Sequence, residues 1–382
     1  MIDVAAARET FEGSDDFTVG IEEEFALVDP DTLLLVPRFD VLRHAGAADP
    51  VLSESIAGEL ISSEIEIRSG AGSDVEDARV RQGEARRRLF TLAREHGVAL
   101  GATGTHPLSD YRDQHIIDTE HYRRVEEGLK YVAWRNNTFS VHVHVGVRGP
   151  DRAVRVCDRL RPVLPLLLAI SANSPYIDGR DSGLHSGRTQ LFTKSFPRCG
   201  IPDVFGSWQA WAEYVELLVR TNSIVEFTQL WWSVRPHHAF GTVEVRICDA
   251  QMTATEADGL TALIVACVRR AAAEVDAGET PPDLPARLIE ENMWRAIRYG
   301  LDGKLLDLDA AAGSGGWDAI REYPAAEALD RLRAWSGADV TLPELNGAQR
   351  QRRMIDAGAA PAEVYAESLR ETHATYLQET VR

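Results

Sequence analysis

Three consecutive glutamates inside an apolar segment constrain this chain more than any other feature of its sequence. The stretch TVGIEEEFALVD, residues 18–29, has the apolar and β-branched composition that favours a strand. Side chains alternate along a strand, so Glu22 and Glu24 share one face, roughly 6.6 Å apart along the backbone, while Glu23 points to the other face. Two carboxylates on one face repel each other unless a cation lies beside them. The segment therefore predicts a strand that presents a cation-binding face.

The same alternation recurs in three other strand-like segments. Their acidic or imidazole residues are Glu64 and Glu66 in SSEIEI, His142 and His144 in FSVHVHVGV, and Glu244 in TVEVRI. A strand with one solvated face shows this period too, but such a face usually mixes Lys, Thr, Ser and Gln with its acids. Here carboxylate and imidazole stand almost alone, and an oxygen-rich set favours Mg²⁺ or Mn²⁺ over Zn²⁺. So many carboxylates indicate more than one ion, with a nucleoside triphosphate as the expected companion.

Strand and helix signals are interleaved along the chain, without a repeat or a low-complexity linker. Strands are expected at residues 17–28, 62–67, 98–103, 139–147 and 242–247. Helices are expected at residues 74–96, 151–171, 207–221, 254–277, 284–299 and 361–380. This order predicts an α+β fold built on one large, mostly antiparallel sheet flanked by helices. We expect a flexible N-terminal leader at residues 1–16 and a single catalytic domain at residues 17–382.

Composition excludes several classes of protein. The net charge of −18 over 382 residues argues against nucleic-acid binding. No apolar run approaches the length that spans a bilayer, and the acidic first residues lack the pattern of a signal peptide. The four cysteines have no metal or redox spacing. These features predict a cytoplasmic enzyme that does not act at a membrane.

Arginines in three further motifs could bind anions beside the metals. They are Arg180 and Arg188 in GRDSGLHSGRTQ, Arg235 and Arg246 in RPHHAFGTVEVR, and Arg295 and Arg298 in ENMWRAIRYG. Taken alone, each is more often a surface or packing residue, but Arg246 stands two residues after Glu244 on the same strand face. The chain has neither a phosphate-binding P-loop nor a dinucleotide fingerprint. Phosphate groups would therefore be held by metals and arginines.

Five motifs in order resemble the bacterial carboxylate–amine ligases classed as type 2 glutamate–cysteine ligases. They are GIEEEF, HVHVG, SANSPYIDGRDSGLHSGRTQLF, RPHHAFGTVEVRICD and ENMWRAIRYGLDG, which together run from about residue 18 to about residue 303. The chain is also similar, more distantly, to glutamine synthetase. The resemblance implies a glutamine-synthetase-like catalytic domain, with a curved sheet that encloses metals and ATP phosphates. It implies ATP and Mg²⁺ or Mn²⁺ as cofactors.

The resemblance also implies individual roles. Glu24 and Glu66 would bind one metal, and Glu22, His142 and Glu244 the other, with Glu64 as a weaker candidate. Arg246 would stabilise the departing γ-phosphate, and Arg235 and His144 would lie against ATP. The carboxylates of the substrate would be bound by Arg180, Arg188 and Arg298. The chain departs from the family pattern at Ser140, at Ser233 and in IEIRSG, which puts the usual substrate pocket in doubt.

The activity implied is that of a ligase in thiol biosynthesis, joining L-glutamate to an amine through a γ-glutamyl phosphate. L-cysteine as the amine rests on the family name alone, and the protein could form a homo-oligomer. A metal-dependent amidohydrolase using His142 and His144 is an alternative, but it leaves Glu22, Glu24 and Glu244 without a role. A catalytically silent ATP-binding relative is another, and guanidino phosphorylation on a related fold is a third.

Overall fold

One antiparallel sheet organises the protein. The computed structural model describes residues 3–279, 284–309 and 316–378. The sheet has the strand order β10 (Val234–His237), β11 (Thr242–Val245), β5 (Val141–Gly146), β1 (Val19–Val28), β3 (Glu64–Arg68) and β2 (Ile56–Ala57), and β4 (Ala99–Gly101) also pairs with β1. Every pairing in it is antiparallel. The predicted α+β class with a large antiparallel sheet is confirmed.

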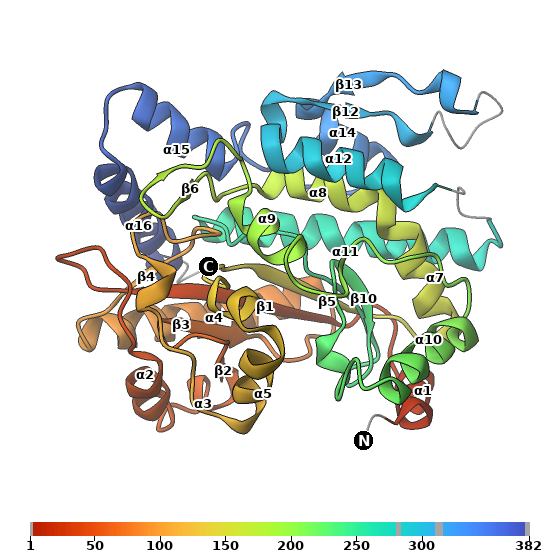
Figure 1. Cartoon of the computed structure of the whole chain (residues 1–382), viewed down its shortest axis with the longest axis horizontal. Helices are drawn as coiled ribbons and strands as arrows, with labels where there is room; N and C mark the ends of the chain where they lie inside the picture. The colour runs from red at the N-terminus through yellow and green to blue at the C-terminus, as the bar shows by residue number, and fades with distance from the viewer. Residues whose placement is uncertain (1–2, 280–283, 310–315, 379–382) are drawn as a thin grey trace.

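Helices cover one face of this sheet. Helices α4 (Val75–Glu95), α7 (Pro150–Leu160) and α11 (Ala254–Asp276) pack on β1, β10 and β5 respectively, and α16 (Pro361–Gln378) packs on β4 and α4. Beyond them lie α8 (Leu164–Ser171), α12 (Ala286–Tyr299), α14 (Ala328–Ser336) and α15 (Gly347–Asp356) (Figure 1). Ile21, Val143 and Val243 point into this core and are essentially inaccessible to solvent. Burying their apolar surface fixes which face each strand turns inward.

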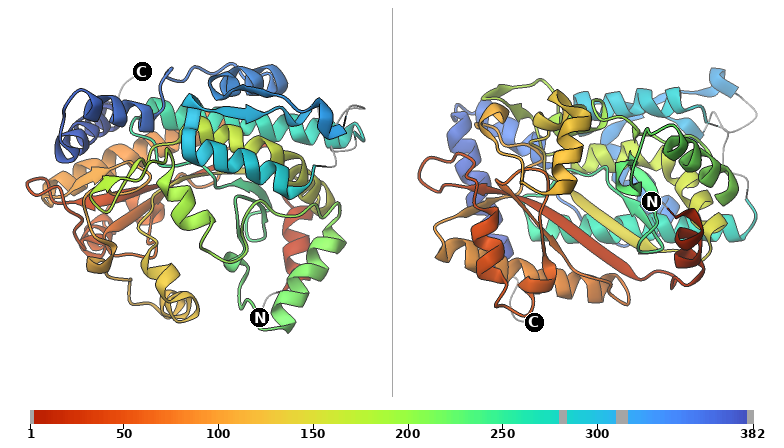
Figure 2. Two further views of the ribbon diagram at one scale, coloured as in Figure 1. Left: turned by 45° about the horizontal axis from the view of Figure 1, so that its top comes forward. Right: turned by 60° about the horizontal axis from the view of Figure 1, so that its bottom comes forward.

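The opposite face is bordered by shorter elements. Helices α5 (Glu120–Leu129) and α9 (Gly187–Thr193) lie on this side and line a cavity there, whereas α10 (Trp208–Arg220) packs on α7. Figure 2 (left) shows α5 and α10 extending away from the stack of C-terminal helices. Further helices are α2 (Phe39–Gly46), α3 (Leu52–Ser55) and α6 (Tyr131–Trp134). Three small sheets pair β6 (Tyr176–Ile177) with β7 (Arg180–Asp181), β8 (Cys199–Gly200) with β9 (Trp231–Trp232), and β12 (Lys304–Leu306) with β13 (Glu322–Pro324).

Most of the expected elements are present, with ends that differ by a few residues. The helix expected at residues 151–171 is interrupted by a 3₁₀ turn at Arg161–Val163, because Pro162 and Pro165 lack the amide hydrogens that a continuous helix needs. The last two residues of the helix expected at 361–380 lie outside the described residues. None of the helices that the structure describes is long and apolar enough to cross a membrane.

The segment expected to be a flexible leader contains helix α1 (Val4–Glu12). Asp3 caps the helix by accepting a hydrogen bond from the Ala6 amide at 2.9 Å. Phe11, on its inner face, is fully buried and meets the ring of Trp208 edge-on, with centroids 5.6 Å apart. The helical periodicity of apolar residues in this segment is too short to predict a helix. The helix forms because its apolar face packs on the rest of the protein. Residues 1–2 lie outside the described part of the chain.

Candidate active site

Strand register brings the predicted acidic and imidazole residues together on one face. Glu22 pairs with His142, Glu24 pairs with Glu66, and His144 pairs with Glu244 across neighbouring strands. Directly paired side chains lie close together, so residues from four separate segments meet on the face away from the core. The predicted strand face of the EEE motif is therefore formed, and Glu23 lies on the opposite face.

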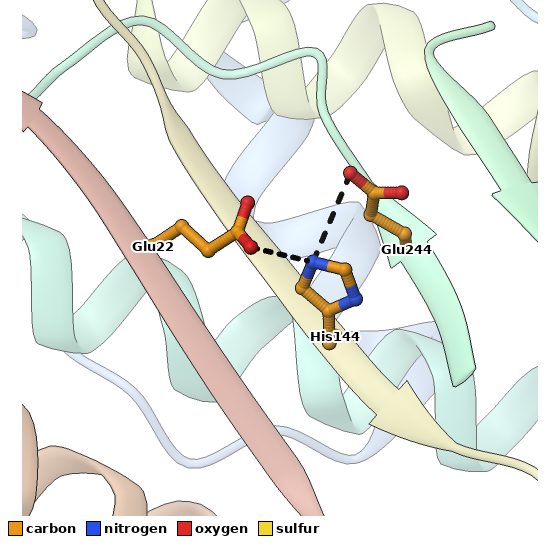
Figure 3. A group of neighbouring side chains, drawn as sticks. All are labelled: Glu22, His144 and Glu244. Carbon is orange, nitrogen blue, oxygen red and sulfur yellow. Dashed lines mark ion pairs between the residues drawn. The ribbon is translucent and has the colours of Figure 1, made fainter. Parts of the chain in front are cut away.

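The first group of potential ligands contains Glu22, His144 and Glu244, whose nearest donor atoms all lie within 4.8 Å of one another. His144 Nε2 is 3.4 Å from Glu22 Oε1 and 3.8 Å from Glu244 Oε1 (Figure 3). This nitrogen is buried and makes no hydrogen bond to any described residue. The other ring nitrogen, Nδ1, is 3.0 Å from the Thr242 hydroxyl, a contact that orients the ring. An oriented imidazole whose free nitrogen faces two carboxylates fits a divalent cation.

The second group contains Glu24, Glu59 and Glu66, again with one donor atom each within 4.8 Å of the others. Glu24 accepts hydrogen bonds from both the amide and the hydroxyl of Ser140, each at 2.6 Å, which fix its orientation. Three carboxylates make an oxygen-only set that fits Mg²⁺ or Mn²⁺. Glu59 had not been recognised in the sequence, because it lies in the turn between β2 and β3 and belongs to no alternating pattern.

His142 lies between the two groups. Its Nδ1 is 3.2 Å from Glu22 Oε2, and its Nε2 is 2.8 Å from the Ser140 hydroxyl and 3.9 Å from Glu24 Oε1. The structure thus brings His144, which had been expected nearer the nucleotide, together with Glu22 and Glu244, and places His142 beside them. Glu64 is buried and lines the adjoining cavity but belongs to neither group.

Buried carboxylates in this region lack sufficient positive charge. Burial and the neighbouring carboxylates of Glu22 and Glu59 raise the pKa of Glu66 well above its usual value. Burial and the charges of Glu24 and Glu59 do the same to the pKa of Glu64. These carboxylates resist ionisation because they lack a nearby counter-charge. A divalent cation bound beside them would strongly stabilise their ionised form.

Glu244 has the opposite environment because two arginines flank it. Arg235 Nε donates to Glu244 Oε2 at 2.6 Å, and Arg246 contacts Glu244 Oε1. Burial raises the pKa of Glu244, but the charges of Arg235 and Arg246 outweigh it and hold that pKa well below its usual value. Arg235 also donates to the carbonyl oxygens of Leu230 and Thr228. Its guanidinium therefore fixes the position of Glu244.

Arg246 is placed to meet a ligand as well. Its side chain lines the cavity beside Glu24, and its Nε is buried without a hydrogen bond to any described residue. Arg188, which lines the same cavity, donates to the carbonyl oxygens of Ile247 and Arg246 at 3.0 and 3.1 Å. A buried donor without a partner is costly, so an anion beside Arg246 would be stabilised.

The other predicted arginines lie farther out. Arg180 is exposed on β7, and Arg298 donates to the Gly183 carbonyl oxygen. Neither is among the described residues that line the cavity. Arg68, which had no predicted role, lies between the ligand groups: it contacts Glu66 and its Nε is 3.5 Å from Glu22 Oε1.

Two cavities adjoin the ligand groups. One is lined by Glu24, Glu59, His142, Arg188 and Arg246 together with apolar and polar side chains of surrounding segments, among them α5, α9 and β9. The other lies beside Glu22, Arg68 and His144 and is mostly apolar, with Ala71 and the exposed ring of Phe240 in its wall. The metal-ligand face therefore separates a polar cavity from an apolar one.

Comparison with known proteins identifies the family. The model of glutamate-cysteine ligase family 2 matches residues 18–379. The chain belongs to glutamate–cysteine ligase family 2. A protein of Rubrobacter xylanophilus named as a candidate glutamate–cysteine ligase 2-2 is 35% identical over 372 residues, with 96% of this chain and 94% of the relative covered. A family-2 protein of Sorangium cellulosum with a similar name is 42% identical over 291 residues, with 76% and 77% covered.

Solved structures of two ligases share the fold of this protein, although their sequences are only distantly similar to it. A bifunctional glutathione synthetase from Pasteurella multocida has a TM-score of 0.64 at 14% identity, with 98% of this chain and 54% of that one covered, so this chain spans about half of its length. A glutamate–cysteine ligase from Francisella tularensis in complex with AMP has a TM-score of 0.63 at 13% identity, with 95% and 90% covered. Together with the antiparallel sheet, these likenesses confirm the predicted glutamine-synthetase-like fold class.

Proposed function

We propose that the protein is an ATP-dependent carboxylate–amine ligase that joins the γ-carboxylate of glutamate to an amine with the aid of Mg²⁺ or Mn²⁺. Family membership supports a ligase. The observation that carries the proposal is the pair of ligand groups, Glu22–His144–Glu244 and Glu24–Glu59–Glu66, placed side by side between two cavities. Two substrates on opposite sides of such a centre would meet at the metals.

The chemistry of the two cavities supports a division of substrates. The apolar cavity beside Glu22, with the exposed ring of Phe240, suits the base of a nucleotide. The polar cavity offers the guanidinium groups of Arg188 and Arg246, which suit an acid substrate and the phosphoryl group transferred to it. The sheet carboxylates would hold divalent cations, which neutralise negative charge on the phosphates when bound.

The reaction would proceed in two displacements. A γ-carboxylate oxygen of glutamate attacks the γ-phosphorus of ATP, the bond from that phosphorus to the bridging oxygen breaks, and ADP leaves. The amine nitrogen then attacks the acyl carbon, the carbon–oxygen bond breaks, and phosphate leaves while a proton passes from the nitrogen to solvent. Arg246, with its free Nε, would stabilise charge on the phosphoryl group during the first displacement. Arg235 would not contact the phosphoryl group; it would hold Glu244 in position by donating a hydrogen bond to that carboxylate.

Trapping with hydroxylamine tests the proposal without knowledge of the natural amine. Purified protein, ATP, Mg²⁺ and glutamate should form γ-glutamyl hydroxamate and ADP, because hydroxylamine attacks acyl phosphates directly. Aspartate, whose side chain is one methylene shorter, is the matched control and should give less product. Absence of hydroxamate with every acid offered would refute the ligase assignment.

A further inference from the structure

The outer part of the polar cavity is walled by aromatic side chains. The rings of Phe192 and Phe196 have centroids 4.5 Å apart, and Phe196 meets Trp231 edge-on at 5.3 Å. All three line the cavity that contains Glu24 and Arg246. The three rings form a continuous apolar surface that begins at α9 and ends at β9.

Apolar side chains from other segments line the same cavity. Leu60 and Val125 belong to one buried cluster, and Tyr122 packs against it. The Tyr122 hydroxyl donates to the Gly58 carbonyl oxygen at 2.5 Å, so this polar atom is already occupied. Polar side chains complete the lining: His121, Asn136, Thr138, Thr228 and Gln229, with His121 Nδ1 2.9 Å from Glu226 Oε1. Apart from the sheet, the cavity therefore offers a substrate both an apolar surface and hydrogen-bonding groups.

The two guanidinium groups of the cavity lie on its sheet side. The arginines among its described lining residues are Arg188 and Arg246, and each is held at the end of β11 by its contacts there. Glutamate itself brings two carboxylates to these two groups. A second amino acid would bring a third carboxylate, and the described lining residues include no further arginine or lysine to pair with it. It would face the aromatic surface, uncharged polar side chains or the carboxylates of Glu59 and Glu64. Leaving a buried carboxylate without a cationic partner is unfavourable.

We propose that the amine used by this enzyme has an apolar or aromatic body and carries no carboxylate. The proposal rests on the ligase function proposed above and narrows it, because cysteine, the amine in the family name, has a carboxylate. The amine would lie against Phe192, Phe196 and Trp231, with its nitrogen toward the acyl carbon of the activated acid.

Matched amine pairs test this directly. Tyramine and tyrosine differ only in a carboxylate, as do cysteamine and cysteine. With glutamate, ATP and Mg²⁺, we expect the member without a carboxylate to have a kcat/KM higher by about tenfold or more in each pair, because the site lacks a partner for that group. Tyramine should exceed cysteamine, because its ring covers more of the aromatic surface. Cysteine exceeding cysteamine would overturn the proposal.

Variants locate the effect in the cavity. Trp231→Ala should lower the ratio of kcat/KM for tyramine to that for hydroxylamine by about tenfold, since apolar contacts of this size contribute that much to specificity. Trp317→Ala is the matched control, because Trp317 is exposed and absent from the described lining residues. Phe192→Ala, at a partly exposed position, repeats the test should Trp231→Ala not fold. An unchanged ratio in the folded variant contradicts the proposal.

Arg198 is the arginine that could bind a carboxylate of the amine substrate, so its substitution tests the opposite of the proposal. Its guanidinium lies 5.7 Å from the Trp231 ring centroid and donates to the Gln229 carbonyl oxygen. If Arg198→Ala selectively abolished activity with cysteine, this arginine would be a carboxylate-binding group and the proposal would be wrong. Hydroxamate formation tests the ligase function separately from the choice of amine. If hydroxamate forms but cysteine is the preferred amine, only the choice of amine is wrong. If no hydroxamate forms, both the ligase function and the choice of amine are wrong.

Discussion

Two imidazoles on one strand face have different surroundings. His144 Nε2 faces Glu22 and Glu244 without a hydrogen bond to a described residue, whereas His142 Nε2 contacts the Ser140 hydroxyl at 2.8 Å. Burial lowers the pKa of His142 to about 4, with Arg246 contributing to the shift. Both residues lie close to the carboxylates, but the geometry favours His144 as the metal ligand.

Substitution of each histidine separates their roles. His144→Ala should raise the Mg²⁺ concentration for half-maximal hydroxamate formation by at least the roughly 10- to 100-fold seen when even indirect metal contacts are removed. His142→Ala is the matched control and should have the smaller effect. The Mg²⁺-induced rise in Tm, measured without substrates, should shrink in the same order. A larger effect of His142→Ala in both measurements would reverse the assignment.

At the scale of a single strand, β1 is anchored from behind. Glu23, between the two front-face glutamates, accepts hydrogen bonds from Arg86 at 2.6 Å, Gln82 at 2.7 Å and Tyr376 at 3.2 Å. Arg86 also donates to Asp258 at 2.8 Å. These contacts join β1 to α4, α11 and α16, so the C-terminal helix helps to fix the strand that carries Glu22 and Glu24.

Loss of Arg86 should therefore destabilise the whole fold. Arg86→Met keeps the volume but leaves Glu23 and Asp258 without this cation, and breaking such a buried pair costs about 3–5 kcal/mol. Arg81→Met, on the same helix, removes a solvent-exposed pair with Asp77 and should lower stability far less, because solvent screens exposed charges. Urea unfolding measures both. Equal losses would show that the buried network contributes nothing beyond an ordinary surface pair.

Periodicity explains what the sequence could reveal at this scale. The alternating acids predicted which residues share the front face, because the side-chain period of a strand is fixed. Which imidazole meets which acid depends on strand order and register, so the sequence could not choose between His142 and His144. Glu59 lies in a turn, where side chains follow no regular period, so its place at the site could not be predicted. The ion pair between Arg235 and Glu244 depends on the pairing of β10 with β11, which the sequence does not reveal.

For the whole molecule, we expect the stability and the proposed metal binding to be coupled through pH. The pKa values of Glu64 and Glu66 are raised well above 4.5 in the folded protein. The metal-free folded state then holds more protons than the unfolded state above that pH, so its stability falls as pH rises. A divalent cation bound there would replace those protons and remove the repulsion between the carboxylates.

The rise in Tm caused by Mg²⁺ should consequently grow between about pH 5 and pH 8, since proton competition weakens as pH increases. Thermal unfolding with MgCl₂, against NaCl of equal ionic strength, measures it. Glu66→Gln removes one of the shifted carboxylates and should flatten the dependence. A Mg²⁺ effect that is constant or decreases toward high pH would contradict a carboxylate metal site.

We propose that glutamate is activated by attack of its own γ-carboxylate on ATP, and oxygen-isotope transfer can reveal this step. Glutamate labelled with heavy oxygen in the γ-carboxylate is converted to amide in the presence of ATP and Mg²⁺, and the released phosphate is analysed by mass spectrometry. We expect one labelled oxygen in phosphate for each amide formed, because the oxygen that attacks phosphorus leaves with it. Amide formed alongside unlabelled phosphate would contradict it.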